Sequence, residues 1–455
     1  MYFEQFYLGC LAHASYMIGS KGEAAVVDPQ RDVDLYLKAA AEHGLTIRYV
    51  FETHLHADFV SGHRELAQRT GAKICLGTRA GATFPHIGLT DGMEIQVGDC
   101  RLRALETPGH TIEGICLVVF DPEKGDKPHA VLTGDTLFIG DVGRPDLSDR
   151  YTPQELAGML YDSLHQKLMA LPDETLVYPA HGAGSLCGRN MRADRFSTIG
   201  TERVTNHALQ IKSREEFIAQ LTTNLPTRPA YFAQDAAINR EGAEPLDHLP
   251  PLLAIGAAEL HRYAGEVTIL DTRAAADFAA AHIPGSIFIG LSGQFASWAG
   301  SLLGLQTPLV LVAESKEKAE EARMRLARVG IETTRGYLEG GIDAWRAAGF
   351  ALESVPQVTI GELRQRLEAG IKVLDVRRRG EWDAGHIDKA QWHALDDFPA
   401  ALPKIDSTAP TAVHCKSGYR SMIACSYLQR AGHRNVVNVV GGYDAWLAET
   451  AAAAG

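Results

Sequence analysis

The chain has 455 residues, of which 45% are hydrophobic and 22% charged, and its formal net charge is -12. These shares are close to globular averages, so disorder and fibrous structure are not expected. At roughly 150 residues per domain, the length predicts about three domains. The acidic balance argues against a nucleic-acid binder or an anionic-membrane binder, because both need a basic surface. We therefore expect small-molecule partners.

The cysteines and the first residues indicate a reducing compartment. MYFEQFYLGCLAHASYMIGS lacks the basic segment and apolar core of a secretion signal. No later run approaches the roughly 20 apolar residues of a membrane span. The seven cysteines form no CxxC pair and no zinc-ribbon spacing. We expect a cytoplasmic protein in which individual thiols, not disulfides, carry chemistry.

Residues 1–240 alternate short apolar strands with helical stretches. Strands are predicted at 24–28, 47–53 and 115–120, and VDLYLKAAAEHG after the first of them is helical in pattern. This alternation implies an α/β layer architecture. The following segment, EGAEPLDHLPPL at 241–252, is rich in proline and acidic residues and lacks periodicity. It is typical of a connection between domains.

Several residues of metal-ligand type follow apolar strands in this first part. In THLHAD, period-two alternation is expected to point His54 and His56 the same way, with Asp58 continuing into the loop. The motifs TPGHT, LTGDTLF and YPAHG add His110, Asp135 and His181. Because α/β sheets gather their functional loops at strand ends, these side chains should converge.

Taken in this order, the motifs resemble the metallo-β-lactamase superfamily across residues 1–240, which implies an αββα sandwich. One residue departs from the pattern. Dinuclear hydrolases of the superfamily usually carry His directly after the motif Asp, whereas Phe59 follows Asp58 here. Asp58, His181 and a shared Asp135 remain for a second ion, but without the imidazole that site is under-coordinated. We therefore expect one tightly held metal.

Two imidazoles and one carboxylate around a metal with open positions suit ferrous iron that binds a substrate and O2 together. The expected ligands of one Fe(II) per chain are His54, His110 and Asp135. This set resembles that of the persulfide dioxygenases, a branch of the superfamily. The resemblance implies that His56, Asp58 and His181 lie outside the triad and orient ligands and water. Zinc outranks ferrous iron in affinity at many such sites, so the metal's identity rests on the resemblance.

Two further residues near these motifs each have two interpretations. By the same resemblance, Arg144 in GDVGRPDLSD binds a carboxylate or phosphate of the thiol carrier, since guanidinium binds such anions bidentately. The alternative is an internal ion pair with Asp141 or Asp146. Cys187 in HGAGSLCGRN is either a sulfur relay near the metal cleft or a packed cysteine without a role in the chemistry.

The second half of the chain is an internal repeat. Residues 267–289 match 371–393, and 336–345 match 438–446. Each copy holds a strand ending in Asp-x-Arg, a His-Ile turn, an apolar strand, a helix and Gly-Gly-x-x-Ala-Trp. That order suits a small, doubly wound parallel sheet. The predicted domains are 1–240, 253–352 and 355–455.

In the second copy an apolar strand ends at Cys415, a polar loop follows, and an amphipathic helix is expected to begin near Ser421. Loop N–H groups, the positive end of the helix and Arg420 favour a thiolate and then a persulfide anion. Phosphatases and arsenate reductases hold phosphate in similar turns, so anion chemistry is predicted more firmly than a named substrate.

The loop CKSGYRS, with Asp375-x-Arg377 upstream and Gly441, Gly442 and Trp446 downstream, closely resembles a single-domain rhodanese. The resemblance implies that Cys415 and Arg420 are catalytic. It implies a persulfide loop made of Lys416, Ser417, Gly418, Tyr419 and Ser421.

The first copy lacks this nucleophile. Alignment through Gly330 and Gly432 places Ala313 or Glu314 where the second copy has Cys415. We therefore interpret residues 253–352 as an inactive rhodanese copy that serves packing or assembly.

The whole domain order resembles the fused persulfide dioxygenase-sulfurtransferases of bacterial sulfide detoxification. The resemblance implies that low-molecular-weight thiol persulfides and O2 react at iron to give sulfite, and that Cys415 transfers sulfane sulfur to or from sulfite and thiosulfate. It also implies a homo-oligomer. One alternative is a glyoxalase-II-like thioester hydrolase with two zinc ions, against which Phe59 and the rhodanese copies count. Another is a sulfur sensor or scaffold without turnover, against which the intact ligand set and the Cys415 loop count.

Overall fold

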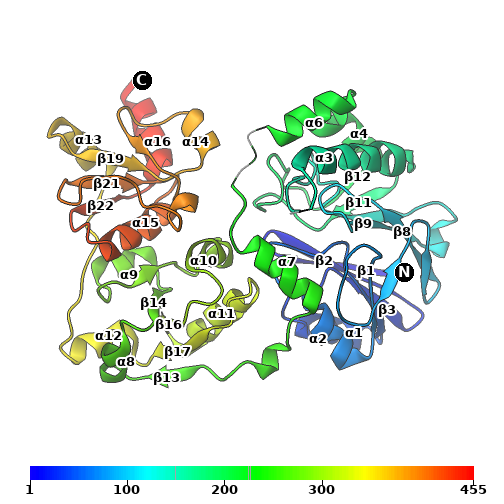
Figure 1. Cartoon of the computed structure of the whole chain (residues 1–455), viewed down its shortest axis with the longest axis horizontal. Helices are drawn as coiled ribbons and strands as arrows, with labels where there is room; N and C mark the ends of the chain where they lie inside the picture. The colour runs from blue at the N-terminus through cyan, green and yellow to red at the C-terminus, as the bar shows by residue number, and fades with distance from the viewer. Residues whose placement is uncertain (149, 224, 226, 455) are drawn as a thin grey trace. The chain divides into compact units, whose positions relative to one another are not determined.

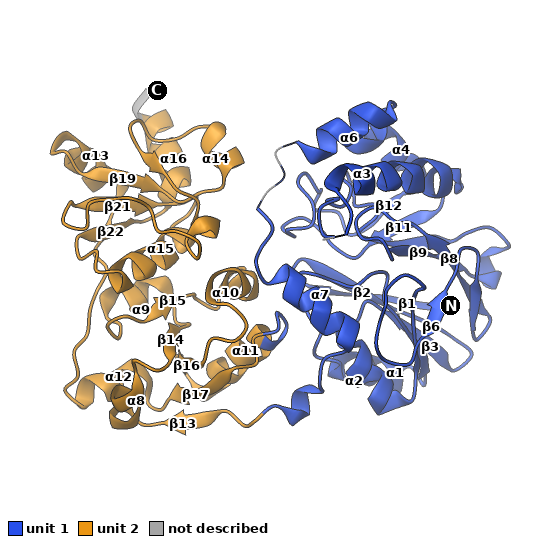
Figure 2. Cartoon of the chain, in the orientation of Figure 1, with its two compact units in different colours: residues 1–249, 327–330 blue, residues 250–326, 331–455 orange. Residues whose placement is uncertain are grey.

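The computed structural model describes residues 1–148, 150–223, 225 and 227–454 of the chain (Figure 1). It divides into two compact units, residues 1–249 with 327–330 and residues 250–326 with 331–455 (Figure 2). The boundaries of the three domains expected from the sequence stay a prediction. Within the described residues, no helix is long and apolar enough to cross a membrane.

The first unit contains two six-stranded sheets. The order of one is β1-β2-β3-β4-β5-β6, and the order of the other is β12-β11-β10-β9-β8-β7. The strands of the first sheet are β1 (Tyr2–Leu8), β2 (His13–Ser20), β3 (Glu23–Val27), β4 (Thr46–Phe51), β5 (Lys73–Gly77) and β6 (Ile87–Leu89). Those of the second are β7 (Glu94–Val97), β8 (Cys100–Glu106), β9 (Ile115–Phe120), β10 (Ala130–Gly134), β11 (Leu176–Pro179) and β12 (Ser197–Thr198).

Side-chain alternation along the strands makes these sheets the two inner layers of a sandwich. In β9, Leu117 and Val119 pack in the core between the sheets, whereas Cys116 and Val118 pack against the helices outside the second sheet. Successive side chains of a strand point to opposite faces, so an uninterrupted apolar strand can fill both cores. The expected αββα sandwich is confirmed.

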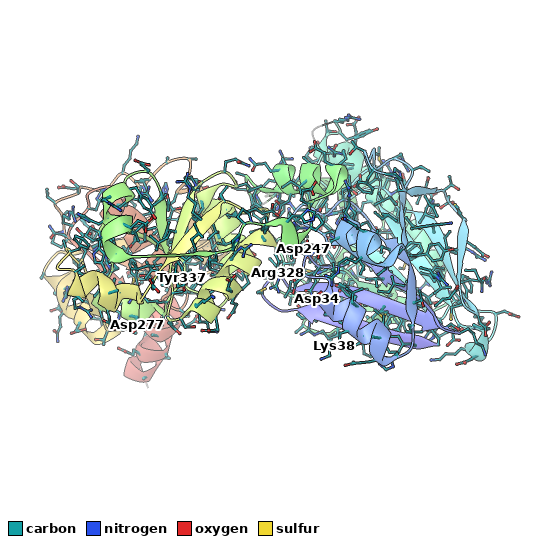
Figure 3. All side chains as sticks on the ribbon, turned by 90° about the horizontal axis from the view of Figure 1, so that it is seen from below. Asp34, Lys38, Asp247, Asp277, Arg328 and Tyr337 are labelled. Carbon is teal, nitrogen blue, oxygen red and sulfur yellow. The ribbon has the colours of Figure 1, made fainter. Side chains whose placement is uncertain are left out.

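Helices cover the outer faces of both sheets. They are α1 (Asp34–Glu42), α2 (His63–Thr70), α3 (Pro153–Asp162), α4 (Ile199–Thr205), α5 (His207–Gln210), α6 (Arg214–Thr222) and α7 (Phe232–Glu241), with a π-helical turn at Ser163–Lys167 and 3-10 turns at Pro122–Lys124, Leu168–Ala170 and Leu246–His248. In α1, Tyr36 and Ala40 are buried against the first sheet. Asp34 and Lys38, one turn apart, are exposed on the opposite side of the helix (Figure 3). The helix is amphipathic, as a covering helix should be.

The second unit holds two five-stranded parallel sheets with the same order of strands. The first sheet consists of β13 (Leu253–Ile255), β17 (Thr334–Leu338), β16 (Leu309–Val312), β14 (Thr268–Asp271) and β15 (Ile287–Phe288). The second consists of β18 (Gln357–Val358), β22 (Val436–Val439), β21 (Thr411–His414), β19 (Lys372–Asp375) and β20 (Gln391–Trp392). The expected tandem of doubly wound domains is confirmed.

Helices accompany both sheets. They are α8 (Ala257–Tyr263), α9 (Ala275–Ala280), α10 (Phe295–Leu303), α11 (Lys316–Ala327), α12 (Gly341–Ala347), α13 (Ile360–Glu368), α14 (Arg379–Asp383), α15 (Tyr419–Arg430) and α16 (Gly442–Ala454), with a 3-10 turn at Leu395–Asp397.

Strand register identifies the residue of the first copy that corresponds to Cys415. Asp271 pairs with Val312 in the first sheet, and Asp375 pairs with His414 in the second. The next residue along each chain is Ala313 in the first copy and Cys415 in the second. Of the two positions that the sequence left open, Ala313 is therefore the counterpart.

Candidate metal centre and cysteine loop

The three expected metal ligands lie together, although their positions in the sequence are far apart. His54 follows β4, His110 lies between β8 and β9, and Asp135 directly follows β10. Asp135 Oδ2 is 3.4 Å from His110 Nε2 and 3.9 Å from His54 Nε2. All three residues are buried, and one ligand atom of each lies within 4.8 Å of the others.

Hydrogen bonding leaves the ligand atoms of this triad available. His110 Nδ1 lies 2.9 Å from the carbonyl oxygen of Arg144, and His54 Nδ1 lies 3.1 Å from the hydroxyl of Thr53. Each Nδ1–H can donate there, so each Nε2 keeps its lone pair. Asp135 Oδ2 is buried without a hydrogen-bond partner among the described residues. A metal ion held by these atoms would satisfy all three, so the residues fit one.

The ionisation of the triad also suits a metal. Burial, reinforced by the neighbouring His56 charge, lowers the pKa of His54 well below its ordinary value, and burial lowers the pKa of His110. Burial alone would raise the pKa of Asp135, but the charge and hydrogen bond of His181 bring it well below its usual range. Neutral imidazoles and an ionised carboxylate are the states in which these groups bind a divalent ion.

His181 connects the triad to a second group of candidate ligands. Its Nδ1 lies 2.7 Å from Asp135 Oδ1, and its Nε2 lies 3.0 Å from Asp58 Oδ2. Burial lowers the pKa of His181, but the two carboxylates outweigh this effect and raise it well above the ordinary value. His56, Asp58 and His181 each offer a ligand atom within 4.8 Å of the others. A second cluster therefore lies beside the first.

His56 lies beside His54, with the centroids of the two rings 4.1 Å apart, and it also contacts two carboxylates that His54 does not. Its Nε2 is 3.2 Å from Asp28 Oδ1 and 3.4 Å from Glu52 Oε2. Because β4 ends at Phe51, before either histidine, the positions of the two rings come from the loop and not from the alternation of a strand.

Arg144 and Cys187 lie next to each other, close to the candidate metal ligands. The Arg144 guanidinium donates to both carboxylate oxygens of Asp146, at 2.6 and 2.7 Å, which is one of the two interpretations that the sequence offered. Its backbone N–H donates to the carbonyl of Cys187. Cys187 offers its thiol within 4.8 Å of ligand atoms of Asp135 and His181. Burial and the nearby carboxylates raise the pKa of this thiol well above its ordinary value.

Sequence reasoning missed Asn239, which ties α7 to the loop that carries the metal motif. Its side-chain amide donates to the carbonyls of His56 and Phe59, both at 2.8 Å, and its carbonyl accepts the N–H of Ser61. Asn239 is fully buried, as is Asp235 one turn earlier. Two polar residues on the buried face of a helix are the signal that could have pointed to this contact.

Two other residues that the sequence analysis did not name position the ligands. Asp28 accepts hydrogen bonds from the backbone N–H and the hydroxyl of Thr53, at 2.7 and 2.9 Å. At Gly143, a Cβ would lie 2.1 Å from the carbonyl oxygen of Asp135 and 2.8 Å from His110 Nδ1. Only glycine lets the backbone come this close to both ligands.

The cysteine loop lies at the other candidate site. Cys415 directly follows β21, and its buried Sγ accepts a hydrogen bond from the N–H of Gly418 at 3.1 Å and lies 3.5 Å from the Ser421 hydroxyl. Helix α15 begins at Tyr419, earlier than expected, because Gly418 adopts φ 103° and ends the loop there. The thiol therefore lies beside the helix N-terminus, where anions are favoured.

Other residues of the rhodanese pattern support this loop. Arg420 donates to both carboxylate oxygens of Glu381, at 2.6 and 2.7 Å. A Cβ at Gly442 would lie 2.5 Å from the carbonyl oxygen of Cys415 and 2.6 Å from that of Lys416. The Gly-Gly motif thus allows the start of α16 to pack against the loop, whose Lys416 and Ser417 are exposed.

Comparisons with known proteins also divide the chain into a metallo-beta-lactamase part and a rhodanese part. The model of the metallo-beta-lactamase superfamily matches residues 8–181, and that of the rhodanese-like domain matches 256–348 and 359–449. Persulfide dioxygenase ETHE1, mitochondrial, of Bos taurus is 33% identical over 222 residues, which cover 47% of this chain and 77% of that protein. Hydroxyacylglutathione hydrolase of Rhodospirillum rubrum is 31% identical over 220 residues, 48% of this chain and 77% of that protein.

Among solved structures, a metallo-beta-lactamase from Staphylococcus aureus subsp. aureus COL superposes with a TM-score of 0.67 at 33% identity. The match covers 74% of this chain and 98% of that one. It therefore extends beyond the first unit, into the part of the chain that holds the parallel sheets.

Proposed function

Because the chain belongs to the metallo-beta-lactamase superfamily and carries two rhodanese-like domains after that domain, we propose that it oxidises thiol persulfides and transfers sulfane sulfur. In this proposal His54, His110 and Asp135 hold one Fe(II) per chain. The terminal sulfur of a low-molecular-weight persulfide becomes sulfite, with both atoms of O2 and one oxygen from water, and the carrier leaves as a thiol.

The ligand set is the observation that carries the proposal. Two neutral imidazoles and one carboxylate point to one position, and this combination is typical of iron oxygenases. When bound, ferrous iron would supply the open positions at which sulfur and O2 meet. Phe59 follows Asp58 where dinuclear relatives carry a histidine, and its buried ring packs 4.4 Å from the ring of His56. Because a phenyl ring cannot bind a metal, Phe59 supports a site with one metal ion instead of two.

The surrounding residues would orient these ligands. His181 fixes the carboxylate of Asp135 through Oδ1 and leaves Oδ2 directed at the two histidines. Arg144 fixes His110 through its carbonyl oxygen, in addition to any contact with the carrier. Such partners hold ligands in one orientation and tune their basicity.

At the second site, we propose that the Cys415 thiolate takes the outer sulfur of a persulfide and releases the carrier thiol. Sulfite then takes that sulfur, which gives thiosulfate and restores the thiolate. The N–H of Gly418 and the start of α15 support the anion at each stage. Transfer in the opposite direction, from thiosulfate, uses the same groups.

The roles of Cys187 and of the assembly stay predictions. The thiol of Cys187 is close enough to Asp135 and His181 for a sulfur relay. Its burial raises its pKa, which disfavours the thiolate that a relay needs. A packed cysteine therefore remains the simpler interpretation. A homo-oligomer is expected from the resemblance alone.

One alternative has specific support. Hydroxyacylglutathione hydrolases match the same region at similar identity, and His56, Asp58 and His181 offer a second set of ligand atoms. A chain that used both clusters would be a dinuclear zinc thioester hydrolase with an accessory sulfurtransferase domain.

Metal analysis and product analysis together test the proposal. We expect close to one iron per anaerobically purified chain, and persulfide turnover that gives thiosulfate in the wild type but sulfite in Cys415→Ser. Cys425→Ala, a buried cysteine further along α15, is the control and should leave the products unchanged. Two zinc ions per chain with thioester hydrolysis and no persulfide turnover would support the alternative.

A further inference from the structure

A cavity of about 300 Å³ lies beside the metal-bearing loops of the first unit. Leu55 and Ala57, which alternate with the residues of the histidine motif, form part of its lining. Thr111, the residue after His110, forms another part. The volume is at the lower end of the range for ligand-binding pockets.

Helix α7 forms one wall of this cavity. Phe232, Ala236 and Arg240 are spaced four residues apart, so they share one face of the helix, and all three line the cavity. The same helix carries Asn239, which is hydrogen-bonded to the metal-bearing loop. These hydrogen bonds fix the position of α7 relative to the loop that carries His54 and His56.

The lining of the cavity is strongly basic. It contains four arginines from separate segments of the chain: Arg79, Arg150, Arg228 and Arg240. Among the described lining residues the one carboxylate is Glu113, which is buried and accepts the N–H of Leu55. Arg79 lies 3.4 Å from Glu106 in a half-exposed pair, which is a weak interaction. In a chain of net charge -12, this concentration of guanidinium groups is a local exception.

We propose that this cavity binds the carrier part of the persulfide, and that the carrier is a polyanionic thiol with phosphoryl groups remote from its sulfur. The inference rests on the proposed function for the reaction at the neighbouring metal. Guanidinium groups bind phosphoryl oxygens bidentately, and one phosphoryl group brings up to two negative charges. A zwitterionic amino acid would bring an ammonium group that four arginines repel.

The test is calorimetric binding to the metal-loaded chain of unreactive thioethers in place of persulfides. S-methyl pantetheine and S-methyl coenzyme A share the sulfur end and differ in their phosphoryl groups, and S-methyl glutathione carries carboxylates instead. We expect the coenzyme A derivative to bind at least about 10-fold more tightly than the other two at low salt, with a smaller difference at high salt.

Variants locate the binding. Arg240→Gln and Arg79→Gln should each weaken binding of the phosphorylated probe by about 5- to 10-fold and leave S-methyl pantetheine unchanged. Arg48→Gln, an exposed arginine paired with Glu23 outside the cavity, is the control and should change neither affinity. Equal affinity for all three probes, a glutathione derivative that binds as tightly, or a preference that both variants keep would overturn the inference.

This experiment separates the inference from the proposed function, because binding of a thioether needs no turnover. A chain that prefers the phosphorylated probe but consumes no O2 with any persulfide would keep the cavity assignment and overturn the oxidation. A chain that oxidises persulfides without the preference would do the reverse.

Discussion

His181 Nδ1 lies 2.7 Å from Asp135 Oδ1, and this contact leaves Asp135 Oδ2 buried and directed at His54 and His110. The final histidine of the metal motifs thus orients Asp135, one of the three proposed ligands. A histidine with that role affects how strongly a metal binds, whereas a ligand of a second ion affects how many metals bind.

Replacement of His181 distinguishes these roles. In His181→Ala the carboxylate of Asp135 loses its hydrogen bond and can turn away, so the iron affinity should fall by about 10- to 100-fold. The number of ions bound at saturation should stay the same. Competition with a chelator measures the affinity, and metal analysis at saturation measures the number. Loss of one of two bound ions, with the other bound as tightly as before, would contradict this role.

Gly143→Ala should disturb the metal site without removing any ligand. The added Cβ would lie 2.1 Å from the Asp135 carbonyl oxygen and 2.8 Å from His110 Nδ1, so one of them must move. We expect a loss of roughly 1–3 kcal/mol in stability, typical of overpacking, together with weaker iron binding. Gly9→Ala, where nothing lies within 4 Å of the new Cβ, is the control for thermal unfolding and iron titration. Unchanged iron affinity in Gly143→Ala would be inconsistent with the close approach.

In the second unit, Tyr419 links the rhodanese-like copy that carries Cys415 to the copy that precedes it. Its hydroxyl donates to the carbonyl oxygen of Gly290 at 2.7 Å, and its ring packs edge-on against Phe288. Tyr419 is the first residue of α15, beside the Cys415 loop. The first copy therefore contacts the residue that follows the Cys415 loop, which is consistent with the structural role expected of it.

Tyr419→Phe should destabilise the second unit by about 1 kcal/mol, the usual effect of losing one hydrogen bond, and should slow sulfur transfer from thiosulfate. Tyr427→Phe is a matched control. That hydroxyl donates to Leu302 at 2.8 Å from further along the same helix, so its loss should lower stability alone. Equal effects of the two variants on sulfur transfer would mean that Tyr419 does not position the loop.

The buried side chain of His63 should make the free energy of unfolding depend on pH. Burial, with repulsion from His56, lowers its pKa to about 3. The unfolded chain takes up a proton at His63 below about pH 6.5, but the folded chain does not until about pH 3. His63 therefore contributes stability above pH 6.5 that is lost as the pH falls.

The size of this effect can be measured. Between pH 7.5 and pH 5, wild type should lose about 2 kcal/mol more stability than His63→Gln in urea denaturation of the first unit. His248→Gln, an exposed histidine, should follow wild type. Parallel pH profiles of wild type and His63→Gln would show that His63 is not held neutral.

The fold could be predicted because its signals are local or repeated. Alternation in β9 places successive residues in two cores, and the two copies of the second unit share an order of strands that their sequences already repeat. The candidate ligands could be identified because each lies just after an apolar strand. Such patterns need no knowledge of distant contacts.

The rest depends on contacts between distant segments. Asn239 is 183 residues from His56, whose carbonyl it contacts, and no periodicity links the two. The close approach at Gly143 exists only once His110 and Asp135 have come together. The pairing of Arg144 with Asp146 instead of Asp141 was likewise a choice that only side-chain geometry could make.

The most direct test of the central claim is O2 uptake by the anaerobically purified, iron-loaded chain after addition of a defined thiol persulfide. We expect wild type to take up half as much O2 as persulfide consumed, because a second persulfide supplies the outer sulfur of thiosulfate. The control His248→Ala, which replaces an exposed histidine outside the ligand set, should show the same ratio. His110→Ala, which removes one of the two imidazole ligands, should show no uptake. No uptake by wild type, with hydrolysis of glutathione thioesters in its place, would contradict the account.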